Sequence, residues 1–471
     1  MLARHRRQAG DRVRLQTGTD DNSLNNVLAA EAAGAGVREF VDRNAAAFDA
    51  LAGPLSLSAD DTIHTSSDPR HRPGVERFWH ACAADLYKAH YEGLYCVGCE
   101  RFYAESELAG GRCPDHGTPP QPVSEENWFF RLSRYAERLY DLIEAGTPRI
   151  EPAERRNEVL AFIAGGLADF SVSRSTARAR GWGIPVPGDP GQVIYVWWDA
   201  LGNYLTALGY GTGGGDHARW WTGADRRVHL VGKGVLRFHA VYWPAMLLSA
   251  GEPLPTDVLV HDYLTVGGRK ISKSAGVTVD PSEVVARYGT DAVRWWLLRE
   301  VPRHGDADFT EDRLVARADD ELANGLGNLV NRTVAMVHRY RDGRVPDART
   351  PGSGTPRGAL DSAELDAAIA SAPGAIGAAL EAFDFRRATG AVQAIVDAAN
   401  RYVNRTRPWE LARTEDAGLD AVLATLVRAC RETAVRLAPF LPDAAARVTR
   451  QCTATAGRLP PAEPVFRRLG G

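Results

Sequence analysis

The sequence predicts a parallel α/β domain split by an insertion and followed by an all-α bundle. Two sets of strand-like apolar segments, separated by a long stretch of different texture, predict the α/β part. From about residue 312 onward, apolar residues recur only at three- and four-residue steps, which predicts helices alone. With 471 residues, 44 % apolar and 24 % charged, the chain can bury several cores, and global disorder is excluded.

The first α/β segment lies at the N-terminus. Residues 13–15 read as a strand, residues 17–22 as a turn rich in helix-capping side chains, and residues 24–31 as the start of a helix. The apolar runs 193–198 and 228–231 are typical of buried parallel strands, each followed by a helical segment. Ligands of such folds bind at the carboxyl ends of the strands. The residues at these predicted strand ends are Asp20, Trp197, Gly232 and Lys233.

Cysteine spacing predicts a metal site between these two sets of strands. The chain has six cysteines and no secretory signal, which argues against a disulfide framework. Two paired-ligand turns can converge on one tetrahedral Zn²⁺, and they would use Cys96, Cys99, Cys113 and His116. Four protein ligands leave no open position, so the zinc would be structural. A zinc-free knuckle or a redox C-x-x-C pair stays open as an alternative.

The charged residues restrict the partners. A net charge of −3 gives no whole-molecule attraction for nucleic acid, so any RNA must meet local arginine clusters. Of the 56 Lys plus Arg residues only four are lysines, and two of these, Lys270 and Lys273, share the stretch K-I-S-K-S. A mobile ammonium is not replaced by arginine's planar fork, so this stretch indicates a site that needs point charges, with chance clustering as the alternative.

The chain shows no targeting or membrane segment by sequence. No apolar run reaches the length of a membrane span, and the N-terminus lacks the apolar core of a signal peptide. We therefore expect a cytoplasmic protein that does not contact a membrane. In the C-terminal bundle, the Pro/Gly-rich stretch 345–357 reads as a loop, because helical patterns of one type flank it.

Several motifs together resemble those of the methionyl-tRNA synthetase family, from residue 1 to about residue 450. The last of them resembles K-M-S-K-S, with Ile271 for Met. The segments that carry the resemblance are Gly18-Thr19-Asp20, the cysteine knuckle, 181–186, 195–200, 231–233, 238–240 and 270–274. The resemblance implies a Rossmann-like class I synthetase catalytic domain split by a zinc-knuckle insertion and followed by an all-α anticodon-binding bundle.

The resemblance also implies domain boundaries. Residues 1–35 would be the remainder of the first half of the catalytic domain, and 36–140 the connective insertion, with the zinc knuckle at 96–116. Residues 141–255 would form the second half of the catalytic domain. The K-I-S-K-S loop region would cover 256–311, and the helical anticodon-binding domain 312–471.

For activity, the resemblance implies a ligase that joins methionine to ATP as an adenylate and passes the aminoacyl group to tRNA. Lys270 and Lys273 would be catalytic, stabilising the charge that grows on pyrophosphate, with Mg²⁺. The ATP-binding residues would be Gly232, Lys233, Lys270, Ser272, Lys273 and Ser274. Asp20 would hold the amino group of methionine. Its side-chain pocket would be lined by Trp197, Ala200, Leu201, Tyr204 and His239, although Trp197 and Tyr204 also fit as plain core aromatics.

In the bundle, Asn328, Arg332 and Trp409 match the family's anticodon-reading residues. Splayed anticodon bases are read by stacking and by edge hydrogen bonds, which an aromatic ring with an Arg/Asn pair supplies. The alternative is a solvated arginine face with a capping tryptophan. We expect a monomer that binds tRNA at its anticodon and acceptor ends.

Three departures from the family pattern keep other functions open. The first signature, H-I-G-H, is absent, and we expect that Met1 is not the true start. Asn22 and Ser23 replace a His and a Gly, and Gly234 replaces a carboxylate. These changes also fit an amino-acid-activating relative with a non-tRNA acceptor, as in natural-product hydrazine or amide synthesis, or a non-catalytic tRNA-binding module.

Overall fold

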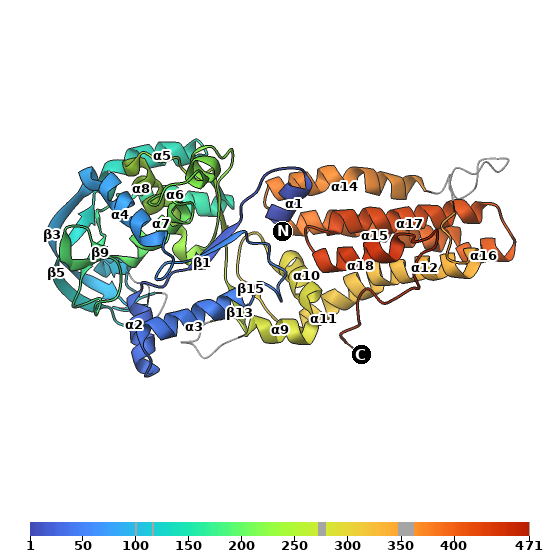
Figure 1. Cartoon of the computed structure of the whole chain (residues 1–471), viewed down its shortest axis with the longest axis horizontal. Coiled ribbons are helices and arrows are strands. Elements are labelled where there is room, and N and C mark those ends of the chain that lie inside the picture. Colours follow the sequence, from blue (N-terminus) through green and yellow to red (C-terminus); the bar gives the residue numbers. More distant parts are fainter. Residues whose placement is uncertain (99–100, 115–116, 272–278, 347–361, 471) are drawn as a thin grey trace. The chain divides into compact units, whose positions relative to one another are not determined.

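The computed structural model describes residues 1–98, 101–114, 117–271, 279–346 and 362–470, and these form two compact units. The α/β unit comprises Arg14–Ala50 and Ala59–His261. The helical unit comprises Met1–Val13, Leu51–Ser58 and Asp262–Gly471. In Figure 1 the α/β unit runs from blue to green, and the helical unit takes the yellow, orange and red elements together with the N-terminus.

Two parallel sheets contain the strands β1 and β11, which precede Asp20 and Lys233. β1 (Gln16–Thr19) pairs with β2 (Asp61–His64) in parallel. β12 (Asp257–His261) lies between β11 (Val228–Gly232) and β6 (Arg149–Glu151), again in parallel. The strand expected at 228–231 is confirmed, whereas the N-terminal strand begins at Gln16, after the predicted residues 13–15.

The parallel strand expected over residues 193–198 is wrong. β10 (Asp189–Ile194) ends inside that run, and it pairs antiparallel with β8 (Ser173–Ser175) and β9 (Pro185–Val186). Helix α7 (Val196–Thr206) then begins two residues later. A short apolar run fits a buried strand and a buried helix equally well, so periodicity could not place this boundary. Trp197 therefore lies in the first turn of α7 and not at the end of a strand.

The insertion is built on an antiparallel sheet. Its long hairpin joins residues far along the chain, with Leu86 opposite Phe130 and Tyr95 opposite Gln121. The strands, in order across the sheet, are β4 (Arg101–Tyr103), β3 (Leu86–Cys96), β5 (Gln121–Phe130) and β7 (Phe170–Ser171).

Helices accompany these sheets, and those between residues 71 and 250 share one core. Trp198 lies at its centre, with ring centroids 5.3 Å from Trp79 and 5.5 Å from Phe78. The helices are α2 (Leu24–Ala32), α3 (Val37–Asp49), α4 (His71–Ala81), α5 (Ala136–Glu144), α6 (Ala153–Ala164), α7 and α8 (Trp243–Ala250). A methyl group on Gly74 of α4 would lie 2.4 Å from the Thr206 side chain of α7. Only glycine allows this close contact, which brings α4 and α7 together beneath the site.

The helical unit confirms the predicted bundle. Its helices are α1 (Leu2–Gln8), α9 (Pro281–Tyr288), α10 (Thr290–Glu300), α11 (Glu311–Arg317), α12 (Asn328–Arg341), α14 (Ala363–Glu381), α15 (Phe385–Thr406), α16 (Pro408–Arg413), α17 (Gly418–Leu437) and α18 (Pro442–Cys452). The segment Ala318–Gly327, between α11 and α12, is a π-helix. A small sheet adds β14 (Arg269–Lys270), β13 (Leu264–Val266) and β15 (Ala307–Asp308).

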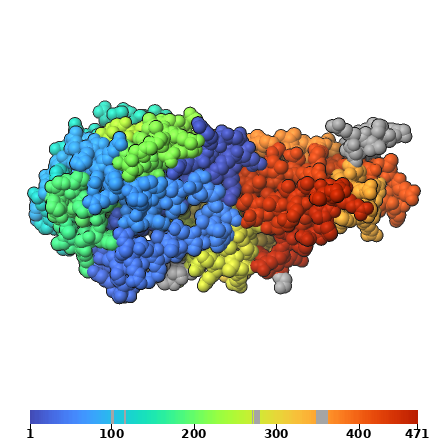
Figure 2. Space-filling view, in the orientation of Figure 1, coloured from blue at the N-terminus to red at the C-terminus, as the bar shows by residue number. Residues whose placement is uncertain are grey.

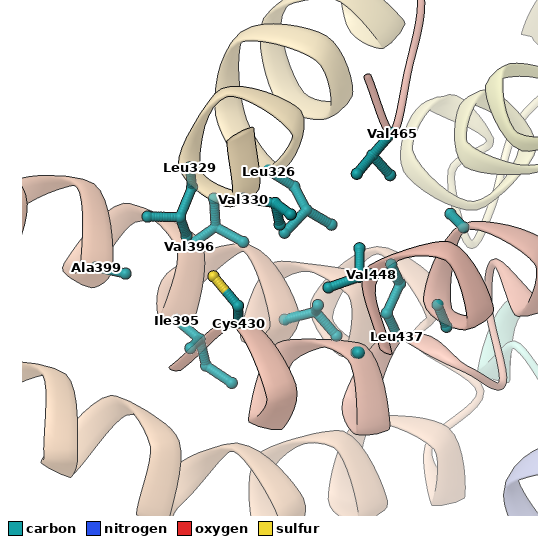
Figure 3. Close-up of a cluster of buried hydrophobic side chains, with 14 of the residues drawn as sticks. Leu326, Leu329, Val330, Ile395, Val396, Ala399, Cys430, Leu437, Val448 and Val465 are labelled. Carbon is teal, nitrogen blue, oxygen red and sulfur yellow. The ribbon is translucent and has the colours of Figure 1, made fainter. Parts of the chain in front are cut away.

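Apolar side chains from four helices meet inside the bundle. Figure 3 shows Val330 of α12, Val396 of α15, Cys430 of α17 and Val448 of α18 pointing toward one another, and all four are buried. The dark blue N-terminal segment lies against the orange and red helices (Figure 2), where Arg6 pairs with Glu381 and Gln8 donates to the Val435 carbonyl. Most of the Pro/Gly-rich loop predicted at 345–357 lies outside the described residues.

No helix in the described ranges has both the length and the apolar character that crossing a bilayer requires.

Candidate functional site

The turn after β1 is held in one conformation by its neighbours. The Asp21 amide donates to Thr65 Oγ1 at 2.8 Å, and the Asp21 carboxylate accepts from Ser66 Oγ at 2.9 Å. Trp182 donates its indole N–H to the Asp21 carbonyl at 2.9 Å, and Ser23 caps α2. The neighbouring Asp20 side chain stays exposed at the surface of the unit. The turn therefore presents one carboxylate, Asp20, for a ligand.

Asp20 lies among other acidic groups. Although its side chain is exposed, the surrounding protein reduces its solvation, and this raises its pKa, helped by the charges of Asp199 and Asp21. His71 acts in the opposite direction, and the resulting pKa is about 6. Above that pH the carboxylate is charged in a negative field, which favours a cationic partner.

Aromatic side chains of α7 and of the segment after β11 pack against one another in one cluster. Trp197 stacks on Phe238 with ring centroids 4.0 Å apart and planes 9° apart. The Tyr204 hydroxyl lies 2.8 Å from His239 Nε2. Ala200 and Leu201, on the same helix, are buried. Two adjoining segments thus hold the predicted residues Trp197, Ala200, Leu201, Tyr204 and His239. Burial raises the pKa of Tyr204, and the charge of Asp20 adds to this effect.

The hydrogen bonds of this pocket define its proton positions. His239 Nδ1 lies 3.0 Å from the Val235 carbonyl, so Nδ1 carries the proton. Nε2 then accepts a hydrogen bond from the Tyr204 hydroxyl. Burial lowers the pKa of His239 to about 4, which keeps the ring neutral. The His239 ring and the Tyr204 hydroxyl therefore form a neutral, hydrogen-bonded pair.

His229 extends the same network and was missed by the sequence analysis. Its ring stacks on Tyr204 at 4.1 Å, and its Nε2 accepts from the Trp243 indole at 3.1 Å. Burial lowers its pKa to about 3. The only signal in the sequence was a histidine inside the apolar run 228–231, a position more typical of an aliphatic side chain.

A second pair missed by the sequence analysis lies beneath Asp20. Asp199 and His71 are both completely buried, and His71 Nε2 is 3.8 Å from Asp199 Oδ1. Thr206 Oγ1 lies 2.8 Å from His71 Nδ1. Burial raises the pKa of Asp199, while His71 and Asn22 lower it. Asn22, which stands where the family pattern has His, therefore places its side-chain amide near the buried Asp199 carboxylate. The same amide also donates to the Thr65 carbonyl.

The predicted ATP-binding residues are described only in part. Gly232 ends β11, and Lys233 begins the 3-10 turn that follows. Lys270 lies in β14 of the helical unit, and its side chain is not described. Ser272, Lys273 and Ser274 lie outside the described residues.

Two of the four predicted zinc ligands are described. Cys96, at the end of β3, and Cys113 lie in one small buried cluster with Tyr103, and Leu108 packs against it. The Cys113 thiol is 3.5 Å from the Tyr103 hydroxyl. Cys99 and His116 lie outside the described residues, and among those described no group of three potential metal ligands occurs. The zinc site therefore stays a prediction.

The three predicted anticodon-binding residues lie in the helical unit. Asn328 begins α12 and is exposed, and Arg332 lies one turn later. Trp409 of α16 is 42 % exposed, and the Arg332 guanidinium is 5.9 Å from its ring. Arg332 and Trp409 therefore lie together, with an exposed aromatic face on which a base can stack.

Family models match most of the chain. A model of class I tRNA synthetases of the methionine type matches residues 1–121 and 115–334. A model of the anticodon-binding domain of methionyl-tRNA ligase matches residues 351–464.

Curated relatives and solved structures agree with these matches. A methionine–tRNA ligase of Brucella suis is 40 % identical over 95 % of this chain and 85 % of its own length. One from Caldanaerobacter subterraneus is 40 % identical over 96 % and 69 %. The structure of Mycobacterium tuberculosis methionyl-tRNA synthetase bound by methionyl-adenylate aligns with a TM-score of 0.90 at 35 % identity, covering 99 % of this chain and 94 % of that one.

Proposed function

The chain belongs to the class I methionyl-tRNA synthetase family and acts as a methionine–tRNA ligase, and from this premise we propose how its residues divide the work. The substrates are methionine, ATP with Mg²⁺, and tRNA. Bound Mg²⁺ would neutralise phosphate charge during adenylation. The two other activities open from the sequence, an amino-acid-activating enzyme with a different acceptor and a non-catalytic tRNA-binding module, find no support among the relatives.

One observation carries the assignment of the methionine site: β1, the strand that leads into Asp20, is joined to α7, where the Gln16 side-chain amide donates to Asn203 Oδ1 at 2.9 Å. A carboxylate beside a neutral aromatic pocket is complementary to an amino acid with an ammonium group and an apolar side chain. In this assignment Asp20 binds the ammonium group. Trp197, Ala200, Leu201, Tyr204 and His239 surround the thioether chain, which packs well against aromatic rings.

For ATP we assign Gly232 and Lys233 together with the K-I-S-K-S residues Lys270, Ser272, Lys273 and Ser274. Gly232 offers a backbone without a side chain at the end of β11, where a nucleotide can approach. Lys270 and Lys273 are the catalytic cations, because negative charge grows on the leaving pyrophosphate in the transition state. Gly234 follows Lys233 directly and offers no carboxylate for the ATP ribose.

For the insertion we assign a structural Zn²⁺ to Cys96, Cys99, Cys113 and His116. The support is that the first and third of these thiols already share one buried cluster, next to the ends of β3 and β4. Thiols suit zinc, and together with Cys99 and His116 these two would complete a set of four ligands that leaves no open position for catalysis. Metal analysis after purification without chelators should find one zinc per chain. Finding none would contradict the assignment.

For the anticodon we assign Asn328, Arg332 and Trp409, supported by the exposed Trp409 ring beside Arg332. The three side chains offer a stacking surface, a cation and an amide, which together can read a splayed base.

The test of the function has two parts that use the same protein. Methionine-dependent ATP/pyrophosphate exchange measures adenylation, and charging of tRNA with methionine measures the complete reaction. We expect both, with exchange lost in Asp20→Ala and retained in Trp409→Ala. Exchange that continues at the same rate without methionine would contradict the assignment.

A further inference from the structure

A buried pair of opposite charges lies inside the α/β unit, behind the Asp20 turn. Asp199 lies in the first turn of α7, and His71 is the first residue of α4. Neither side chain has any exposed surface, and His71 Nε2 is 3.8 Å from Asp199 Oδ1. Neither residue is among the substrate-binding residues assigned above. A buried carboxylate is costly unless a cation lies close to it, so His71 is the group that allows Asp199 to stay ionised.

The contacts of His71 favour its positively charged form. Its Nδ1 lies 2.8 Å from Thr206 Oγ1, and the Thr206 hydroxyl donates to the Asn203 carbonyl at 3.5 Å. Because the hydroxyl proton is used there, Thr206 Oγ1 accepts from the ring, and Nδ1 carries a proton. Nε2 faces a carboxylate, which is an acceptor, so Nε2 carries a proton as well. The two side chains therefore form an ion pair of imidazolium and carboxylate.

The negative end of this ion pair faces the Asp20 turn. Gln16, at the start of β1, donates to Asn203 Oδ1 one helical turn after Asp199, so the strand that leads into Asp20 runs beside α7. The charge of Asp199 raises the pKa of Asp20, and the charge of His71 lowers it by a smaller amount. A charge acts more strongly the nearer it lies, which indicates that the carboxylate end is the closer one.

We propose that His71 and Asp199 are positioning residues of the methionine site, and that their ion pair directs its negative end toward the ammonium group that Asp20 binds. The inference rests on the proposed function, because it takes Asp20 as the residue that binds this ammonium group. The pair is neutral as a whole, which permits its burial. Its nearer end adds negative potential at Asp20. Since neither side chain reaches the surface, the pair acts through its field and not by contact with methionine.

Asp199→Asn should have two effects, and loss of packing would cause only the first. Removing the negative end should raise KM for methionine at pH 8 in the exchange assay by about three- to tenfold, a moderate factor because the carboxylate acts without contact. It should also lower the pKa of Asp20, on which Asp21 then remains the main negative neighbour. The acidic limb of kcat/KM for methionine should therefore move to lower pH by about half a unit or more.

His71→Gln tests the other half of the pair. Gln keeps a donor near the position of Nε2 but not the positive charge, so the buried Asp199 carboxyl takes up a proton. Both charges are then lost, and since Asp199 has the larger effect on Asp20, the acidic limb again moves to lower pH. The double variant should therefore do no more than either single one. His80, exposed at the other end of α4, is the matched control, and His80→Gln should match the wild type.

The deamino analogue of methionine, which has hydrogen in place of the ammonium group, separates charge from pocket shape. Its inhibition constant against methionine in the exchange assay measures binding to the same site. Asp199→Asn should not weaken this binding, because the lost negative charge no longer repels the carboxylate of the analogue. If Asp199→Asn weakens the binding of methionine and of the analogue by the same factor, the pocket has lost its shape and the proposal is wrong.

An acidic limb that stays at the wild-type pH in both single variants would also overturn the proposal. If a single variant unfolds, the double variant replaces it, because two amides in place of the ion pair leave no buried charge without a partner. An unmoved limb in the double variant then counts against the proposal in the same way. Absence of methionine-dependent exchange in the wild type would instead contradict the proposed function.

Discussion

The proposed methionine site and the proposed anticodon face differ in how their side chains are held. In the α/β unit, Tyr204 and His239 are hydrogen-bonded to each other, and burial keeps His229 and His239 neutral. In the helical unit, Trp409 is exposed and Arg332 lies beside it. A small ligand offers little contact surface, so its binding free energy cannot offset a large rearrangement of the protein. The side chains of its site must therefore be oriented and shielded from water before it binds. The unpaired bases of an anticodon loop present their ring faces, so exposed stacking groups on the protein suit them.

The largest effect should come from removing the one charge of the methionine pocket. Asp20→Asn leaves the ammonium group of methionine without its carboxylate, and losing one member of a close charge pair typically costs about 2–5 kcal/mol. We expect KM for methionine in the exchange assay to rise on the order of a hundredfold, with tRNA binding unchanged. Asp42→Asn, an exposed carboxylate of α3, is the matched control. An unchanged KM in Asp20→Asn would remove Asp20 from the site.

A substitution in the helical unit tests the proposed anticodon face, which includes the exposed Trp409 ring. Trp409→Ala removes a stacking surface worth about 1–3 kcal/mol per base, so KM for tRNA should rise roughly ten- to a hundredfold. Exchange without tRNA should not change, because adenylation does not use the anticodon. Phe48→Ala, which removes an exposed ring of α3, should leave both assays unchanged. A fall in exchange for Trp409→Ala would show that the two regions do not act independently.

Measurements over a range of pH also distinguish the two regions, because the proposed methionine site includes a carboxyl group with a raised pKa, that of Asp20. The pKa of Asp20 is raised to about 6, so protonation below that pH removes the charge that attracts the ammonium group. We expect kcat/KM for methionine to fall about tenfold per pH unit below pH 6, and this fall to disappear in Asp20→Asn. The affinity for the tRNA anticodon arm, measured by filter binding, should not follow the same curve.

The same pKa predicts an effect on folding with a definite sign. A carboxyl group whose pKa is raised in the folded protein binds its proton more tightly there, so its contribution to stability is greatest at low pH and is lost as the pH rises through about 6. Asp20→Asn should therefore raise the urea midpoint at pH 8 relative to the wild type, and by less at pH 5. A lower midpoint at pH 8 would contradict the pKa.

The smallest effect should come from loosening the pocket without removing a charge. Tyr204→Phe leaves His239 Nε2 without its donor, which costs about 1–3 kcal/mol for a buried acceptor. KM for methionine should rise up to about tenfold, and the urea midpoint should fall in parallel. A double-mutant cycle with His239→Asn should show that the two substitutions are not additive. Additive effects would mean that the hydrogen bond contributes nothing to binding.

Much of the fold followed from local pattern, and the exceptions have physical causes. The helical bundle and the strand at 228–231 were predictable, because periodic apolar spacing over long segments is specific. The run 193–198 was not, since Trp197 and Trp198 are as apolar in a buried helix as in a buried strand. For the candidate site, the motifs indicated Trp197, Tyr204 and His239, which the structure places in two adjoining segments, while their roles stay predictions. The contacts of His71, Asp199 and His229 were not predictable, although Asp199 lies within the segment 195–200, because they join residues far apart in the chain.

The π-helix Ala318–Gly327 runs directly into Asn328, the first residue of α12. A wider helical turn holds one more residue than an α-helical turn, and each residue added or removed rotates everything after it by about 100°. The angular position of Asn328 and Arg332 on their helix is therefore set by the residue count of the segment before them. In evolutionary terms, a one-residue deletion there would rotate the proposed anticodon-binding side chains of α12 by about 100° while leaving each of them in the gene.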